Sequence, residues 1–459
     1  MKKRSIMPPL KPISSRFYRK VSSEQRMTFF SPKKPIGSRF CAGHGVSISV
    51  LLCALMVWVP VSANAQTDRA ASISMQDALK KTLLQHPELP GYNQLLKSAD
   101  GYIQQAGIGE RTELSFLVED AFGSGDYNGI DNAQSTLSLS WLLQGELLDK
   151  RTIAARTQKN TFLAQQEIKR LDIAAETARY YLTTLFFQKK KQLELDAIAQ
   201  LKRVENEVAR RVDAGAAPRA DLYRAQAGLS EKKLVLNDVD YEMDSAIQNL
   251  AAQWGEFEPG FSAVQGSLDV PEEKMNLFAI RERLADNPNI QLFLSEERLA
   301  QSKIDLAKTE TKALWRFNAG VRRYEATNDY GVVAGVSVPL GSRDRNQGKV
   351  RALAAEQAAF RANAEAMRIR MEAQLANYVR SFERYQLSEA ALKQEIIPQI
   401  ERALKEAEKA YKLGKYSFEE WSSAQRELLA AKAALLDLQF KAHLNRVEIE
   451  RLVGAAIQA

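Results

Sequence analysis

Cysteine and histidine are scarce in this chain, whose 459 residues include two cysteines and three histidines. Cys41 and Cys53 both precede residue 66, so the later sequence has no thiol for a disulfide bond or a nucleophile. His86 and His443 are the histidines after that point, and they are too few for a histidine-rich metal site. We expect His86 at a helix end and His443 in packed surroundings. The sequence therefore predicts no catalytic residue, no metal site and no cofactor, and a protein that is not an enzyme.

A basic surface for nucleic acid is also missing, although the formal net charge is +8. Residues 1–65 contain 11 Lys and Arg and one acid, Glu24, which gives a net charge of +10. The remaining residues contain 53 basic side chains (64 less 11) and 55 acidic ones (56 less 1), which gives −2. The positive excess lies in the N-terminal segment, so nucleic acid is excluded as a partner.

Long apolar runs are absent as well, apart from residues 46–59. That run is shorter than the ~20 residues of a membrane-spanning helix. Basic residues up to Arg39 precede it and Ala63-Asn64-Ala65 follows it, which is the plan of a secretory signal peptide cleaved before Gln66. A retained membrane anchor is the alternative. We expect residues 1–65 to be removed on export.

The chain does contain an internal repeat at an offset of 199 residues, the separation of Gly215 and Gly414. Each glycine is followed by an apolar stripe with alternating steps of three and four residues, the period of a coiled coil. Lys232 interrupts the first stripe and Asn445 the second. The predicted parts are a first repeat, a linker without helical period and a second repeat, at residues 66–255, 256–274 and 275–459.

Each copy also contains two segments in which the apolar period is two. They lie at about 113–122, 133–143, 315–324 and 330–339. Segments of about ten residues suit tilted membrane strands. A small soluble sheet that caps a helical body is the alternative, and the signal peptide favours the membrane interpretation. Four strands cannot close a transmembrane barrel, which needs about eight, so closure would require several chains.

The rest of the chain is predicted to form long helices, at about 147–212, 217–253, 347–413 and 418–452. The longer ones would reach on the order of 100 Å and cannot pack into one globule. We expect them to fold back as antiparallel hairpins that turn at Gly215 and Gly414, because glycine adopts positive φ without strain.

Duplicated turns, paired strands and long hairpins together resemble the outer-membrane efflux protein family of TolC type, over about 73–454. Two local sequences carry the resemblance further, Val336-Ser-Val-Pro-Leu340 and the motif Asp344, Arg345, Asn346, Gln347 and Gly348. The motif is similar to that of the branch serving heavy-metal cation efflux. The first copy departs from the family pattern, with residues 141–150 in place of a shorter glycine-rich strand exit.

The resemblance implies a mainly α fold with membrane β-structure. Three identical chains would supply four strands each to one twelve-stranded β-barrel in the outer membrane of a Gram-negative cell, in contact with its lipid. The coiled-coil hairpins would form an α-helical tunnel in the periplasm. The implied function is passive conduction of substrate, here heavy-metal cations, from an inner-membrane RND-type pump and a periplasmic adaptor to the exterior. The same channel for drugs or organic compounds is an alternative.

The resemblance also implies residues for a gate at the periplasmic tip. Glu420, six residues after Gly414, matches an acidic pore ring of the family, and Asp221 is its counterpart in the first copy. Tyr411 matches a position that ties the closed tip together by hydrogen bonds. A compatible alternative is that Glu420 and Asp221 stabilise helix N-termini, where the macrodipole favours a carboxylate.

The turns themselves would be the docking surface for the adaptor. The candidates are Gly215, Ala216, Pro218, Gly414 and Lys415. The alternative is that these residues only form good turns. A periplasmic adaptor or a coiled-coil scaffold without a pore would also be rich in hairpins, but two hairpins with paired strands in each copy favour the channel.

Overall fold

The structure is a computed structural model and describes residues 72–272, 274–341 and 345–454, which belong to a unit formed by residues 65–459. Some predicted features lie outside the described residues. They are the signal peptide at residues 1–65, residues 66–71 of the first repeat, residue 273 of the linker, and residues 342–344 and 455–459 of the second repeat, which include Asp344 of the motif.

Short helices precede the strands in both halves of the unit. They are α1 (Met75–Gln85) and α2 (Leu89–Ala106) in the first half, and α5 (Leu277–Glu282), the 3-10 turn η2 (Arg283–Asp286) and α6 (Pro288–Thr309) in the second. Proline lacks a backbone N–H and has a fixed φ, so it ends one helix and suits the first turn of the next. Accordingly, α1 ends shortly before Pro87, and α6 begins at Pro288.

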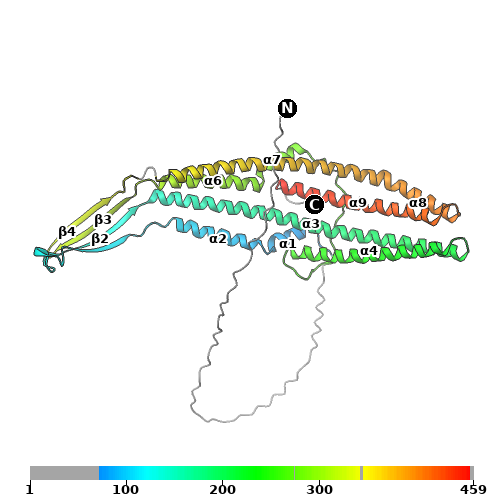
Figure 1. Cartoon of the computed structure of the whole chain (residues 1–459), viewed down its shortest axis with the longest axis horizontal. Helices are drawn as coiled ribbons and strands as arrows, with labels where there is room; N and C mark the ends of the chain where they lie inside the picture. Colours follow the sequence, from blue (N-terminus) through cyan, green and yellow to red (C-terminus); the bar gives the residue numbers. More distant parts are fainter. Residues whose placement is uncertain (1–71, 273, 342–344, 455–459) are drawn as a thin grey trace, which may run out of the picture. The chain divides into compact units, whose positions relative to one another are not determined.

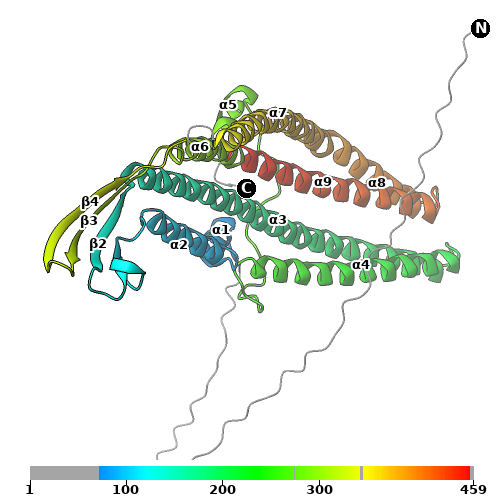
Figure 2. The same cartoon turned by 60° about the vertical axis from the view of Figure 1, so that its left-hand side comes forward.

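The first long hairpin consists of α3 (Gly145–Asp213) and α4 (Arg219–Ala252), close to the predicted ranges. The 69 residues of α3 correspond to roughly 100 Å at 1.5 Å per residue. Figures 1 and 2 both show α4 running back along α3. The antiparallel hairpin predicted to turn at Gly215 is therefore confirmed.

The second long hairpin differs from the prediction of one continuous helix over 347–413. Helix α7 (Gln347–Ala391) passes through a π-helical turn, η3 (Leu392–Ile396), into α8 (Ile397–Lys412), and α9 (Phe418–Leu452) runs back. The interruption comes directly before Pro398, which cannot donate to the carbonyl of Gln394 and would clash with it in a regular α-helix. The π turn changes the hydrogen-bond spacing at this point. Pro398 is thus the sequence signal for the break.

Four strands form one antiparallel sheet in the order β1-β2-β3-β4. They are β1 (Glu113–Glu119), β2 (Gln134–Leu143), β3 (Trp315–Tyr324) and β4 (Asp329–Ser337). The pairing of β2 with β3, which sets Ser138 opposite Gly320, joins the two halves of the chain. Within the described residues, β1 and β4 each keep one edge without a partner strand. The predicted mainly helical fold with four strands is confirmed.

Two strands end earlier than predicted. β1 stops at Glu119 because Asp120 and Phe122 have φ values of 57° and 59°, which an extended strand does not allow. β4 stops at Ser337, two residues before Pro339, which has no N–H for the strand ladder.

One face of the sheet is apolar and exposed. Residues paired across neighbouring strands lie on the same face. Phe116, Leu137, Val321 and Val332 form one such row, and Val332 is 86% exposed. Other exposed members of this face are Leu114, Val118, Leu139, Trp141, Leu143, Trp315, Tyr330 and Val336. Figures 1 and 2 show no helix in the described part of the chain lying over the sheet. An apolar face of this kind marks a contact surface for lipid or another chain.

The opposite face of the sheet is polar. Arg322 of β3 donates hydrogen bonds to Thr136 Oγ1 at 2.9 Å, Gln134 Oε1 at 2.8 Å and Glu119 Oε2 at 2.9 Å. This guanidinium joins β1, β2 and β3. The two faces therefore differ as the period of two predicted.

The described residues of the predicted linker contain no helix and pack on α3. Val264 forms a parallel bridge with Ile73, and its N–H donates to Gln188 Oε1 at 3.1 Å. The Tyr181 hydroxyl donates to the carbonyl oxygen of Gln265, and burial raises the pKa of Tyr181 to about 12. The linker is thus fastened to the long helix.

The turns of the two hairpins have the same hydrogen-bond pattern. The bonds run from the N–H groups of Gly215 to Val212 O (3.0 Å), Ala216 to Arg211 O (2.7 Å), Gly414 to Tyr411 O (2.9 Å) and Lys415 to Ala410 O (2.9 Å). This is the Schellman motif, in which the residue after the helix is left-handed. The φ values of Gly215 and Gly414 are 69° and 72°. Both turns therefore require glycine for their backbone conformation.

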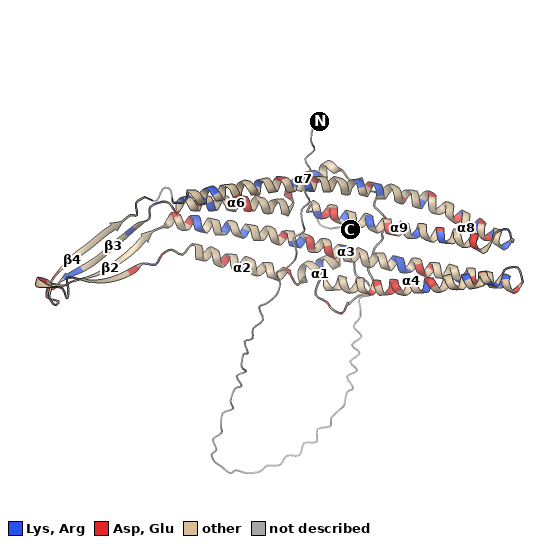
Figure 3. Cartoon of the chain, viewed as in Figure 1, with Lys and Arg blue, Asp and Glu red and all other residues tan. Residues whose placement is uncertain are grey.

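Charged side chains of both signs alternate along the long helices, and the strands carry few of them (Figure 3). Such a mixture of charges is typical of solvated helix faces. None of the helices in the described residues has both the length and the apolar composition needed to cross a membrane.

We expect Gly414→Ala to destabilise the protein by about 1–2 kcal/mol, because alanine in a left-handed conformation places its Cβ too close to the following carbonyl oxygen. Gly101→Ala is the matched control. Gly101 lies inside α2 with no neighbouring atom within 4 Å of an added Cβ, so alanine should stabilise by roughly 0.5–1 kcal/mol. Thermal unfolding measures both changes. Equal shifts for the two variants would contradict the role of the turn conformation.

Stability should also depend on the protonation of His443 in α9. Its Nε2 lies 3.2 Å from the carbonyl oxygen of Asp269, and burial lowers its pKa below the ordinary 6.5. The unfolded chain then binds the proton more readily, so the free energy of unfolding falls as the pH drops below 6.5 toward the lowered pKa.

Thermal unfolding of the wild type and His443→Gln between about pH 7 and pH 5 tests this dependence. In His443→Gln, the slope of the free energy of unfolding against pH should be much smaller than in the wild type. Burial lowers the pKa of His86 as well, so a smaller slope should remain. An unchanged slope in the variant would exclude His443 as its source.

Candidate functional site at the helical turns

Both helical turns lie at the same end of the unit, and the strands lie at the opposite end (Figures 1 and 2). The five turn residues singled out in the sequence are all exposed there. They are Gly215, Ala216, Pro218, Gly414 and Lys415. The structure therefore brings the two predicted docking segments to one end of the hairpins.

A hydrophobic cluster joins the two hairpins below the turns. Its buried members are Val204 and Val208 of α3, Ala225 of α4, Ala407 and Tyr411 of α8, and Phe418 and Trp421 of α9. All four helices that form the turns contribute to it. The hairpins are thus packed together near their ends, a contact that the separate stripes of the sequence did not specify.

Tyr411 lies at the centre of this cluster and is buried. Its ring stacks on Trp421 with 4.8 Å between centroids and 25° between planes. The guanidinium carbon of Arg211, in α3, lies 4.7 Å from the Tyr411 ring centroid, and Arg211 also donates a hydrogen bond to the Tyr411 carbonyl oxygen. The pKa of the Tyr411 hydroxyl is raised above its ordinary value, because the effect of burial exceeds the opposite effect of the Arg211 charge.

The Tyr411 hydroxyl has no hydrogen-bond partner in the part of the chain that the structure describes. The hydrogen-bonding role implied by the family resemblance is therefore not seen within one chain. Sequence reasoning missed Arg211 altogether. Its place four residues before Gly215 was a signal, because it put a cation in the last turn of α3.

Glu420 caps α9. Its side chain accepts a hydrogen bond from the Ser417 N–H at 2.7 Å, and Ser417 Oγ accepts from the Glu420 N–H at 3.3 Å, which is a capping box. The backbone hydrogen bond from Ser417 lowers the pKa of Glu420 below 4.5. The carboxylate therefore stabilises the helix start at neutral pH, and this contribution is lost as the pH falls through the lowered pKa.

Asp221 occupies the first turn of α4 but makes no corresponding cap. The N-cap residue is Pro218, which has no side-chain hydrogen bond, and the Asp221 N–H donates to its carbonyl oxygen at 3.0 Å. Asp221 is half-buried, and its charge raises the pKa of Tyr411. The helix-terminus alternative thus fits Glu420 more closely than Asp221.

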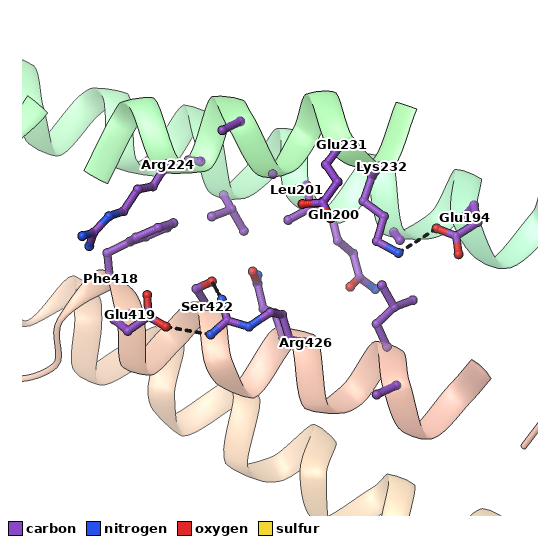
Figure 4. Close-up of a pocket in the computed structure, with 18 of the residues that line it drawn as sticks. Glu194, Gln200, Leu201, Arg224, Glu231, Lys232, Phe418, Glu419, Ser422 and Arg426 are labelled. Atoms are coloured by element: carbon purple, nitrogen blue, oxygen red, sulfur yellow. Dashed lines mark hydrogen bonds and ion pairs between the residues drawn. The ribbon is translucent and has the colours of Figure 1, made fainter. Parts of the chain in front are cut away.

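A pocket of about 640 Å³ lies between the hairpins, lined by α3, α4 and α9. We call it the inter-hairpin pocket. Figure 4 shows side chains of both hairpins around it. Lys232, which interrupts the first stripe, pairs here with Glu194 at 3.1 Å, and Arg426 pairs with Glu419 at 2.7 Å. Small residues form other parts of its lining, including Ala197, Ala227, Gly228, Ala430 and Ala433.

The family motif lies elsewhere. Asn346 is the N-cap residue of α7, and its Nδ2 donates to the Ala307 carbonyl oxygen at 2.9 Å and to Glu310 Oε2 at 3.2 Å. Arg345 precedes it, and Gln347 and Gly348 begin the helix. The motif thus fastens the start of α7 to the end of α6, close to the strands and far from the turns (Figure 1).

The histidines lie where the sequence predicted them. His86 is the C-cap residue of α1, and His443 is buried in α9. Within the described residues, no group of three or more His, Cys, Asp or Glu side chains is arranged to hold a metal ion.

Known proteins resemble this chain in sequence and in fold. Residues 78–256 match the family described as outer membrane efflux protein. The chain is 26% identical over 391 residues to the cobalt-zinc-cadmium resistance protein CzcC of Cupriavidus metallidurans, covering 84% of this chain and 91% of CzcC. It is 24% identical over 348 residues to the nickel and cobalt resistance protein CnrC of the same bacterium, covering 75% and 79%.

The fold is similar to that of a crystal structure of CusC, with a TM-score of 0.68 and 15% identity, covering 83% of this chain and 92% of CusC. This likeness concerns the fold alone. The sequence relatives are efflux and resistance proteins rather than enzymes, which confirms that prediction. Residues 78–256 thus form an outer membrane efflux protein domain, and the chain is homologous to the metal-resistance proteins CzcC and CnrC.

Proposed function

We propose that this chain is the outer-membrane channel of a tripartite efflux system and passively conducts heavy-metal cations. An inner-membrane RND-type pump and a periplasmic adaptor would supply the cations. The relatives CzcC and CnrC support this cargo, since they are named for resistance to cobalt, zinc, cadmium and nickel. Conduction requires weak binding along a pore, which places selectivity in the pump.

The observation that carries the proposal is the sheet. It exposes one apolar face, keeps a polar opposite face and has two edges without a partner strand. A soluble sheet that caps a helical body would bury its apolar face against the helices, and here no helix in the described residues covers it. Lipid on one face and a water-filled pore on the other match this distribution.

The number of strands calls for several chains, and the resemblance to the efflux family favours a homotrimer. One four-stranded sheet cannot close, because the smallest transmembrane barrels need about eight strands. Three chains, each pairing its β1 edge with β4 of the next, would make a twelve-stranded barrel without free edges. The hairpins of the three chains would then form an α-helical tunnel in the periplasm. Residues 1–65 would be removed as a signal peptide during export.

The two halves of the chain would act as equivalent repeats in this tunnel, at residues 66–255 and 275–459, with the linker at residues 256–274 between them. Matching Schellman turns at Gly215 and Gly414 support this, as does the presence of two strands in each half. The π turn in the second hairpin makes the halves unequal in detail.

The adaptor would dock at the turns. Gly215, Ala216, Pro218, Gly414 and Lys415 are exposed there, and small side chains let another helical hairpin approach closely. The inter-hairpin pocket continues this surface along α4 and α9, with small residues and ion pairs in its lining. Glu420, Asp221 and Tyr411 would form the gate at the same end.

We expect the purified chain without residues 1–65 to form a trimer that gives discrete conductance steps in planar bilayers. Val332→Arg and Val333→Arg are a matched pair on adjacent positions of β4 that face opposite sides of the sheet. Arginine on the lipid face costs about 2–4 kcal/mol near the bilayer centre, so Val332→Arg should impair insertion and trimer stability. Val333→Arg should insert normally and reduce the cation conductance by placing charge in the pore.

Detergent-solubilised mass, membrane fractionation and bilayer recording measure these effects. Equal behaviour of the two variants would contradict the assignment of the faces. A monomeric wild type without conductance would favour a periplasmic adaptor or a scaffold. Growth of a channel-deletion strain on cobalt, zinc or cadmium, with and without the complementing chain, separates metal export from export of organic compounds.

We expect the double variant Asp221→Asn and Glu420→Gln to lower cation selectivity and change gating while the trimer persists, because acids facing a pore attract cations. Ser417→Ala is the control. It removes the cap of α9, at a cost of about 1 kcal/mol, and keeps the Glu420 charge. Reversal potentials in a salt gradient measure the selectivity. The same change in Ser417→Ala, or none in the double variant, would remove these carboxylates from the gate.

A further inference from the structure

A single side chain, Arg211, touches both helical turns. It lies in the last turn of α3, and its own carbonyl oxygen accepts the Ala216 N–H at 2.7 Å in the first Schellman motif. Its Nη2 donates back to the Ala216 carbonyl oxygen at 3.3 Å. Its Nη1 donates to the Tyr411 carbonyl oxygen, which also accepts the Gly414 N–H at 2.9 Å in the second Schellman motif. The guanidinium therefore bridges a backbone carbonyl of each turn.

The same guanidinium lies over the ring of Tyr411, with 4.7 Å between its carbon and the ring centroid. A planar guanidinium can make such a contact and donate several hydrogen bonds in fixed directions at once, whereas an ammonium group is a point charge. The ring is in turn stacked on Trp421, which is buried. Residues of α3, α8 and α9 are thus connected in one series of contacts.

The hydroxyl of Tyr411 takes no part in these contacts, since it has no hydrogen-bond partner in the described residues. What Tyr411 offers to the first hairpin is its ring face and its backbone carbonyl. Phenylalanine would keep both of them.

We propose that Arg211 is a positioning residue that holds the two hairpin turns of one chain together, and that it acts through the ring and the carbonyl of Tyr411 rather than its hydroxyl. The clamp between Arg211 and Tyr411 fixes the separation of the turns at the end where the proposed function places the gate. The part of this inference that concerns gating rests on the proposed function. The part that concerns the separation of the turns does not.

The experiment measures the distance between the turns directly. Ala216→Cys and Lys415→Cys place one spin label on each exposed turn, because the sequence after residue 65 contains no other cysteine. Double electron–electron resonance measures the distance between the two labels in the protein without residues 1–65, solubilised in detergent. The distance distribution gives the population of molecules with separated turns. The variants are Arg211→Ala, Arg211→Lys, Tyr411→Leu and Tyr411→Phe, each with circular dichroism as a check of helicity.

Arg211→Ala should increase the population with separated turns by about ten-fold, because a cation–π contact and a charged hydrogen bond are lost together. Tyr411→Leu removes the ring and keeps the carbonyl, so it should give a smaller increase. Arg211→Lys, which keeps the charge and folds with the least disturbance, should give most of the increase expected for Arg211→Ala. Tyr411→Phe should leave the distance distribution unchanged. An unchanged distribution in Arg211→Lys and Arg211→Ala, or an equal effect of Tyr411→Phe and Tyr411→Leu, would overturn the clamp.

Bilayer conductance of the same variants separates the two proposals. A longer open time in Arg211→Lys together with separated turns supports both the clamp and the gate. Separated turns without any change in conductance keep the clamp and contradict the gate at this end. Conductance changes without separated turns would overturn the clamp.

Discussion

The packing of α3 is the interaction on which the other parts of the structure depend. This helix of 69 residues contacts α1, α2, α4, α6 and α9, so it touches elements of both halves of the chain. An isolated helix hairpin of this length buries only a narrow stripe. Ion pairs add to the contact between α3 and α9, with Arg179 2.6 Å from Glu448 and Arg451 3.1 Å from Asp172. Through α3, the first hairpin is therefore packed against α6 and α9 of the second half of the chain.

The two hairpins share the turn motif but differ in continuity. The first has one uninterrupted helix, and the second passes through the π turn before Pro398. The linker meets the second hairpin at this point, where Lys393 lies 2.5 Å from Asp269 and 2.8 Å from Glu389. Glu389 is buried and also accepts a hydrogen bond from Gln439 of α9 at 2.6 Å. Paired and hydrogen-bonded charges of this kind hold the π turn in one geometry.

The opposite ends of the unit have different chemistry. At the strand end, large apolar side chains are exposed on one face of the sheet, and polar side chains on the other face are linked by Arg322. At the turn end, Tyr411, Phe418 and Trp421 are buried between the hairpins, and the turns expose small and charged residues together with Leu413 and Tyr416. A surface that meets lipid must be apolar, whereas small side chains at a docking surface permit close approach of another helical hairpin. This contrast is what the proposed assembly uses.

Local rules of the sequence were sufficient for much of this fold. The period of two located the strands, the steps of three and four located the hairpins, and Gly215 and Gly414 marked their turns, because these features depend on neighbouring residues alone. The prediction made β1 too long, because it missed the left-handed conformation of Asp120. It also joined α7 and α8 into one helix, because it missed the effect of Pro398. The turn residues were found individually, and the resemblance to the efflux family added Glu420, Asp221 and Tyr411. Which of them meet was decided by the tertiary structure, since the pairing of β2 with β3 and the placement of Arg211 on Tyr411 bring together residues about 200 positions apart. Such contacts depend on how the hairpins pack side by side, and no periodicity within either hairpin specifies that.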